Sequence, residues 1–144
     1  MDLLERARAL VACPLFADLA PAVVIRLAER ARPATLEAGE RKTTDDTVWI
    51  VVEGSLVIAS RAAMSAVASI STTRKHGGTA TAGHVLGLVR VIAPQTPALD
   101  AVAEKTSVVI GISVDDMRDV LEEDQVALTA LSAALARRLL EGTS

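Results

Sequence analysis

The chain has 144 residues, enough for one hydrophobic core and too few for two. Just over half of its side chains are apolar, yet Phe16 and Trp49 are the only aromatic ones, so it has few rings on which nucleic-acid bases could stack. The formal net charge of −3 and the pI of about 5.4 argue against binding to a phosphate backbone, because the basic residues form no continuous stripe.

The cysteine content and the hydropathy of the chain exclude further classes of protein. The only cysteine is Cys13, which excludes an internal disulfide and any site with several cysteine ligands, and between Ala12 and Pro14 it reads as a small buried hydrophobe. No apolar run approaches the ~20 residues of a membrane span, and the first ten residues lack the apolar core of a signal peptide. These observations predict a cytoplasmic protein without a metal site.

The chain begins with two predicted helices, over residues 2–12 and 21–32. Pro14 ends the first helix and Pro33 ends the second, while the Leu15-Phe16 pair between them is predicted to be a buried anchor. Helical spacing assigns the apolar face of the first helix to Leu3, Leu4, Ala7, Leu10 and Val11.

The middle of the chain has the patterns of β-strands. A strand is expected at 35–37, and the continuous apolar run at 48–52 predicts a strand that is covered on both faces. Glu53-Gly54 is a turn signal, so residues 56–60 are expected to return as the hairpin partner of that strand. Alternation over residues 64–71 predicts a half-exposed strand. Residues 73–83 then read as a hairpin tip with a short return strand.

Residues 84–103 form the most informative segment. After Gly87 the chain makes one short apolar turn and then enters an alternating strand, an order that suits a loop that cradles a ligand. Another alternating strand follows at 108–112. His84 has no second metal-ligating side chain nearby, so it is read as structural.

Two helices are predicted to close the chain. Ser113 and Asp124 are expected to be their N-caps, and the first helix buries Val114, Met117, Val120 and Leu121. The second helix, over residues 125–141, is apolar on nearly every side, which predicts contact both with its own domain and with another surface. The residues expected to make the outer contact are Leu128, Leu131, Leu135 and Leu139.

Three strings, in this order, resemble the cyclic nucleotide-binding domain of Crp/Fnr-type regulators: LLERARALVACPLFADLAP, VWIVVEGSL and AVAEKTSVVIGISVDDMRDVLEED. The resemblance implies an α+β fold in which an antiparallel, jelly-roll-like β-roll is flanked by N-terminal and C-terminal helices. It implies a single domain over residues 1–144, with helices at 2–32, the β-roll at 34–113 and C-terminal helices at 114–141.

The resemblance also locates a degenerate ligand site. In the family's cassette a glutamate binds the ribose and an arginine binds the phosphate, whereas Leu88 and Pro97 stand at these positions here. The loss of two charge-assisted hydrogen bonds weakens cyclic AMP binding by about 3–6 kcal/mol, on the order of a hundred- to ten-thousand-fold. Arg90 is open to two interpretations, as a substitute cation or as a solvated side chain, and Leu88 and Leu99 are expected to plug the cavity. The residues assigned to the site are Gly87, Leu88, Val89, Arg90, Pro97, Ala98 and Thr129.

No arrangement of catalytic residues is recognisable, so an enzyme is not expected and no cofactor is assigned. The principal hypothesis is a regulatory module that does not bind cyclic AMP or cyclic GMP in the usual way and acts through protein contacts, as a homodimer or on a larger partner. Two alternatives stay open: a sensor of a cyclic dinucleotide or an apolar effector, and the effector domain of a Crp/Fnr-type regulator without its DNA-binding part. No nucleic-acid contact is expected within these residues.

Overall fold

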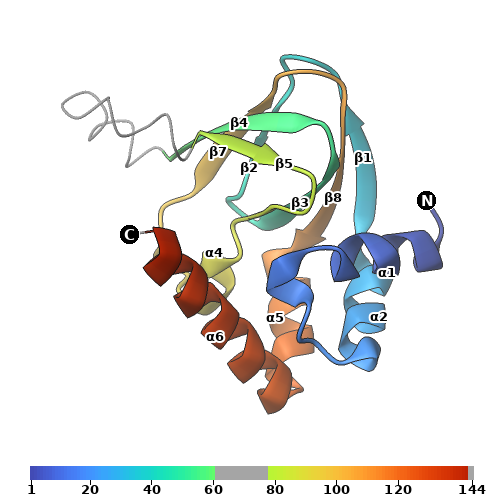
Figure 1. The fold of residues 1–144 in the computed structure, drawn as a ribbon, viewed down its shortest axis with the longest axis vertical. Helices are drawn as coiled ribbons and strands as arrows, with labels where there is room; N and C mark the ends of the chain where they lie inside the picture. Colours follow the sequence, from blue (N-terminus) through green and yellow to red (C-terminus); the bar gives the residue numbers. More distant parts are fainter. Residues whose placement is uncertain (61–77, 143–144) are drawn as a thin grey trace.

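The structure is a computed structural model that describes residues 1–60 and 78–142. The predicted strand at 64–71 and the hairpin tip as far as residue 77 lie outside the described residues, whereas the expected short return strand is present as β5. In chain order the elements are α1 (Leu3–Val11), η1 (Pro14–Phe16), α2 (Pro21–Arg30), β1 (Arg32–Leu36), β2 (Arg41–Thr43), β3 (Thr47–Glu53), β4 (Ser55–Ser60), β5 (Thr79–Thr81), β6 (Val85–Leu86), α4 (Val89–Ile92), β7 (Leu99–Ala103), β8 (Ser107–Ser113), α5 (Val114–Glu122) and α6 (Gln125–Gly142) (Figure 1).

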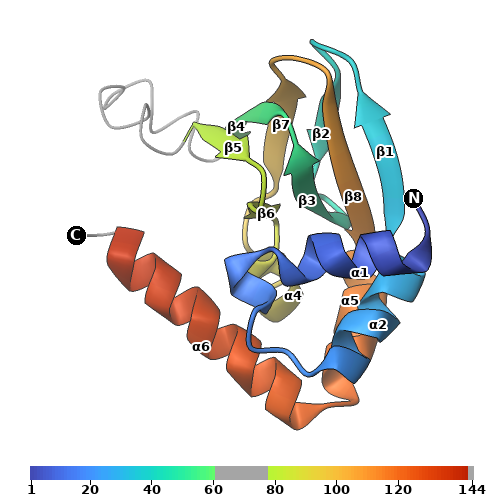
Figure 2. The same ribbon diagram turned by 45° about the vertical axis from the view of Figure 1, so that its right-hand side comes forward.

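The described strands form two antiparallel sheets of four strands each. One sheet has the order β1-β8-β3-β6 and the other has the order β2-β7-β4-β5. Figure 2 shows the two sheets facing each other at one end of the molecule, with α1, α2, α5 and α6 gathered at the other end. This arrangement confirms the predicted α+β fold with a β-roll between N-terminal and C-terminal helices.

Local capping explains where the C-terminal helices begin. The Ser113 Oγ accepts a hydrogen bond from the Asp116 N–H at 3.0 Å, and the Asp124 Oδ1 accepts one from the Ala127 N–H at 3.0 Å. Each side chain satisfies a backbone donor that the helix itself leaves unpaired. Both predicted caps are confirmed, and Pro21 occupies the first position of α2, as expected.

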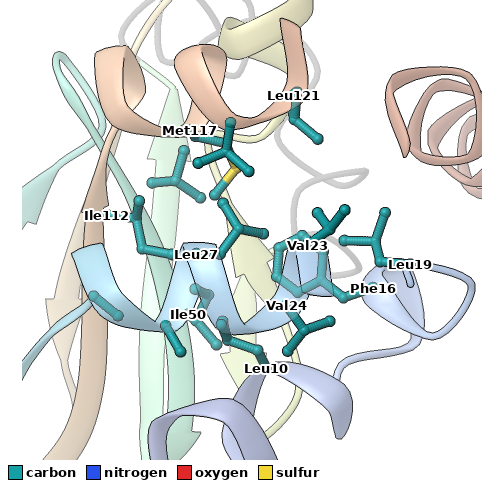
Figure 3. Close-up of a cluster of buried hydrophobic side chains, with 14 of the residues drawn as sticks. Leu10, Phe16, Leu19, Val23, Val24, Leu27, Ile50, Ile112, Met117 and Leu121 are labelled. Carbon is teal, nitrogen blue, oxygen red and sulfur yellow. The ribbon is translucent and has the colours of Figure 1, made fainter. Parts of the chain in front are cut away.

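A first hydrophobic core joins the helices to one face of the sheet that contains β3 and β8. Figure 3 shows its central side chains, which come from α1, η1, the turn before α2, α2, β3, β8 and α5. The predicted anchor Phe16 is 1% exposed and lies in this core, which also contains the predicted buried face of α5. The labelled side chains are Leu10, Phe16, Leu19, Val23, Val24, Leu27, Ile50, Ile112, Met117 and Leu121.

A second, smaller core fills the space between the two sheets, and β3 serves both cores. Val48 and Ile50 belong to the helical core, whereas Val51 packs with Leu56 and Val109 inside the roll. The prediction that this apolar strand is covered on both faces is therefore confirmed.

The predicted hairpin between residues 48–52 and 56–60 is wrong, because β3 and β4 lie in different sheets. β3 pairs with β6 and β8, while β4 pairs with β5 and β7. At Gly54 the backbone has φ +101°, and a Cβ atom there would overlap the side chain of Ser107. The Ser107 Oγ instead accepts a hydrogen bond from the Ser55 N–H at 3.1 Å. This close packing turns the chain from one sheet to the other rather than back along β3.

Two expectations for the N-terminal part are also corrected. Leu3, Leu4 and Val11 are 37%, 58% and 55% exposed, so Ala7 and Leu10 alone supply the buried face of α1. The roll begins at Arg32, and Pro33 lies inside β1 rather than ending a helix. β1 is an edge strand, where a residue without an N–H donor is tolerated.

Candidate functional site

A cavity of about 360 Å³ lies at the segment singled out in the sequence. Gly87, Leu88, Val89, Arg90 and Pro97 all line it, so the structure brings together most of the predicted site residues. The other lining residues are Leu15, Thr44, Val85, Thr96, Leu99 and Leu135. Ala98 is buried and Thr129 is exposed, and neither lines the cavity.

The backbone at the cavity is held by Thr44. The Thr44 Oγ1 accepts a hydrogen bond from the Leu99 N–H at 2.8 Å, and the Thr44 N–H donates to the Leu99 carbonyl at 3.0 Å. Gly87 has φ +88° and lies so close that an added Cβ atom would be 2.8 Å from the Thr44 Cβ atom. One threonine therefore fixes both ends of the loop that forms the cavity wall.

Arg90 is bonded to the backbone rather than free in solvent. Its side chain is half-buried, and the guanidinium donates to the carbonyl oxygens of Thr96 and of Asp45, the latter at 3.0 Å. Its Nε is buried and has no hydrogen-bond partner within the described residues. Arg90 thus connects the loop after β2 to the segment before β7.

Leu88 and Pro97, the two residues that the resemblance assigns to the charged positions of the cassette, both line the cavity. Leu88 is 2% exposed and belongs to the helical core, whereas Pro97 is exposed at the rim. Within the part of the chain that the structure describes, Arg90 is the only charged residue that lines the cavity. Leu88 and Leu99 form part of the wall, yet about 360 Å³ stays open, so the expected plug is incomplete.

Helix α6 closes one side of the cavity. Two of the leucines that were expected to make the outer contact of this helix face inward instead. Leu135 lines the cavity, and Leu131 is only 1% exposed within the helical core. Leu128 is half-buried and lines a separate cavity with Ser132, whereas Val126 is 79% exposed. The side chain of Leu139 lies outside the described part.

Among the described residues, none of the helices has the length and hydropathy of a membrane span.

The remaining candidate side chains are structural. The His84 Nδ1 accepts a hydrogen bond from the Thr81 N–H at 2.8 Å, and no group of His, Cys, Asp and Glu within residues 1–60 and 78–142 is arranged to hold a metal ion. Cys13 is fully buried, and this burial raises the pKa of its thiol to about 11. Cys13 is therefore the buried hydrophobe that the sequence predicted rather than a nucleophile.

Sequence reasoning missed five residues at the cavity, of which Leu135 was expected on the outer face of the last helix. Thr44 and Thr96 stand in loops whose path depends on distant hydrogen bonds, and Val85 has the pattern of an ordinary strand residue. Leu15 was expected to be a buried anchor, and it does pack against the core. Its position in the cavity wall was not expected. No local signal distinguishes these residues, because each reaches the cavity through contacts made only after folding.

The two-sheet roll and its flanking helices have the fold of solved cyclic nucleotide-binding domains. A putative cyclic nucleotide-binding protein from Geobacter metallireducens GS-15 has a TM-score of 0.69 at 19% identity, over 98% of each chain. The sensor domain of the transcriptional regulator DNR from Pseudomonas aeruginosa has a TM-score of 0.68 at 16% identity, over 98% of this chain and 93% of that one.

A third similar structure is the regulatory subunit of a cAMP-independent protein kinase A from Trypanosoma brucei. It has a TM-score of 0.66 at 15% identity, and the match covers 94% of this chain and 48% of that chain. No protein-family model matches the sequence, and a search of curated proteins also finds no match. At these identities the likeness establishes the fold, as the sequence resemblance predicted.

Proposed function

We propose that this chain is a non-catalytic regulatory module with a cyclic nucleotide-binding fold whose cavity does not take cyclic AMP or cyclic GMP in the usual way. Regulatory and sensor domains among the similar structures support a regulatory role. This role requires no catalysis. The Cys13 thiol is buried and the His84 ring accepts a backbone hydrogen bond, so neither side chain is placed as a catalytic group.

The observation that carries this proposal is the lack of a charged partner for a cyclic phosphate or a ribose. Leu88 and Pro97 replace the two charged side chains, and Arg90, the one cation at the cavity among residues 1–60 and 78–142, donates to two backbone carbonyls. A phosphate bound in a bidentate pair by Arg90 would compete with the carbonyls of Thr96 and Asp45 for its terminal nitrogens, and those oxygens would lose charge-assisted hydrogen bonds.

A titration with cyclic AMP and cyclic GMP tests the proposal. A ligand present at a hundred times its dissociation constant adds about 2.7 kcal/mol to the free energy of unfolding, which raises the Tm by on the order of 10 °C. We expect no shift with either nucleotide up to millimolar concentration. A saturable shift that is lost in Arg90→Gln would contradict the proposal, because it would show that Arg90 can hold the phosphate.

We further propose that the module acts through contact with another protein, a second copy or a larger partner, made by the outer face of α6. Val126, Ala133 and Ala136 are exposed on this helix, whereas Leu131 is committed to the core. Light scattering tests self-association: we expect a mass above 15.0 kDa that returns to the monomer value in Ala133→Arg. A monomer at every concentration would exclude the second copy as the partner.

A further inference from the structure

We propose that the cavity beside Gly87 binds an uncharged, largely hydrocarbon small molecule. This inference rests on the proposed function, since it assigns a ligand class to a cavity from which the cyclic nucleotide contacts are missing. Its walls are mainly apolar, with Leu15, Leu88 and Leu135 on the helical side and Val85 and Leu99 on the strands of the roll.

The Thr44 hydroxyl and the two terminal nitrogens of Arg90 are already bonded within the chain, whereas the buried Arg90 Nε has no partner among the described residues. The Thr44 hydroxyl accepts from the Leu99 N–H, and the Arg90 guanidinium donates to the carbonyls of Thr96 and Asp45. No carboxylate among the described residues lines the cavity. A charged ligand would lose its hydration and would gain at most the single N–H of the Arg90 Nε, whereas an apolar ligand has no such hydration to lose and covers leucine and valine side chains.

The size of the cavity suits a small ligand. Its volume of about 360 Å³ lies within the range of about 300–1,000 Å³ for small-molecule sites. It is more than twice that of an apolar cavity of about 150 Å³ that takes benzene. A molecule with two fused rings or a medium-length alkyl chain thus fits the available space.

The position of the cavity also provides a route for the ligand. Pro97 is exposed at its rim, so the cavity is reached from solvent without opening the core. Leu15 and Leu135, both half-buried, belong to η1 and α6, which pack against each other. A bound hydrocarbon would therefore contact both helical segments as well as the roll.

The neutral fluorescent probe N-phenyl-1-naphthylamine tests this proposal on the full chain. We expect saturable fluorescence enhancement with a micromolar dissociation constant, and at least tenfold weaker binding in Val89→Trp, which fills the cavity. Ile92→Trp is the matched control, because Ile92 lies on the same short helix, is 41% exposed and does not line this cavity. Leu99→Phe is a second filling variant, used if circular dichroism shows that Val89→Trp is unfolded.

Competition then separates the ligand classes. We expect 1-decanol to displace the probe at least tenfold more effectively than decanoate, which has the same chain length and a negative charge. Absence of probe binding, binding that persists in both filling variants, or stronger displacement by decanoate would overturn the ligand assignment alone. Displacement by cyclic AMP would instead contradict the proposed function, so the two failures are distinguishable.

Discussion

Gly87 lies directly against Thr44, and an added Cβ atom on Gly87 would be 2.8 Å from the Thr44 Cβ atom. Thr44 in turn is hydrogen-bonded to both the N–H and the carbonyl of Leu99. The shape of the cavity wall therefore depends on one residue without a side chain and on one short, buried side chain. A larger residue at either position would displace the wall.

Gly87→Ala is accordingly expected to be more destabilising than Gly39→Ala. Both glycines have positive φ angles, +88° and +92°. An alanine at either position must therefore adopt the left-handed conformation, which costs about 1–2 kcal/mol. Only Gly87 also has a neighbour too close for a Cβ atom, which adds about 1–3 kcal/mol of overpacking. Urea denaturation of the two variants measures the difference, and equal losses would show that the contact with Thr44 has no energetic effect.

Gly111→Ala is expected to displace the ring of Trp49. A Cβ atom at Gly111 would lie 2.7 Å from the Trp49 Cζ3, and the ring is held by its Nε1, which donates to the Thr43 carbonyl at 2.9 Å. We expect a loss of about 1–3 kcal/mol in the free energy of unfolding and a changed emission spectrum. Because Trp49 is the only tryptophan, the spectrum reports this site alone.

A double-mutant cycle provides the control for Gly111. In a Trp49→Leu background the crowding ring is absent, so Gly111→Ala is expected to cost less than in the wild-type protein. An unchanged cost would place the strain elsewhere than at the indole.

Leu131→Glu is expected to unfold the protein or to lower its free energy of unfolding by about 4 kcal/mol or more, because Leu131 is 1% exposed in the helical core. Val126→Glu on the same helix is the control. Val126 is 79% exposed, and this change is expected to alter stability by no more than about 0.5 kcal/mol. Thermal and urea denaturation compare them, and a well-folded Leu131→Glu variant would mean that Leu131 belongs to an outer surface.

Cys13 is expected to resist thiol reagents in the folded protein. Burial raises the pKa of its thiol from 9.0 to about 11, so little reactive thiolate forms at pH 8. Modification by a thiol reagent should therefore proceed only as fast as the protein unfolds. Rapid modification without denaturant would contradict the burial of Cys13.

The same shift predicts a dependence of stability on pH. Between about pH 9 and 11 the unfolded chain releases the Cys13 proton while the folded chain keeps it, so the free energy of unfolding falls as the pH rises, by roughly 2 kcal/mol over this interval. Denaturation at pH 8 and pH 10 measures the effect, and Cys13→Ala is expected to show a smaller fall.

Local sequence signals predicted the elements of this fold well. Ser113 and Asp124 marked the starts of α5 and α6, and the apolar run of β3 indicated burial on both faces. These features depend on residues a few positions apart, whose capping bonds and side-chain periodicity are set by the backbone itself.

Which strands pair, and which side chains meet at the cavity, was decided by tertiary contacts. The turn at Gly54 leads to another sheet because Ser107, more than fifty residues away, packs against it. Arg90 reaches the carbonyl of Asp45 across a similar separation, and Leu131 is buried because α6 packs against the helical core. The sequence shows only whether a side chain is apolar or charged. The partner that buries it or uses its charge is chosen only when distant segments compete for the same space and the same hydrogen bonds.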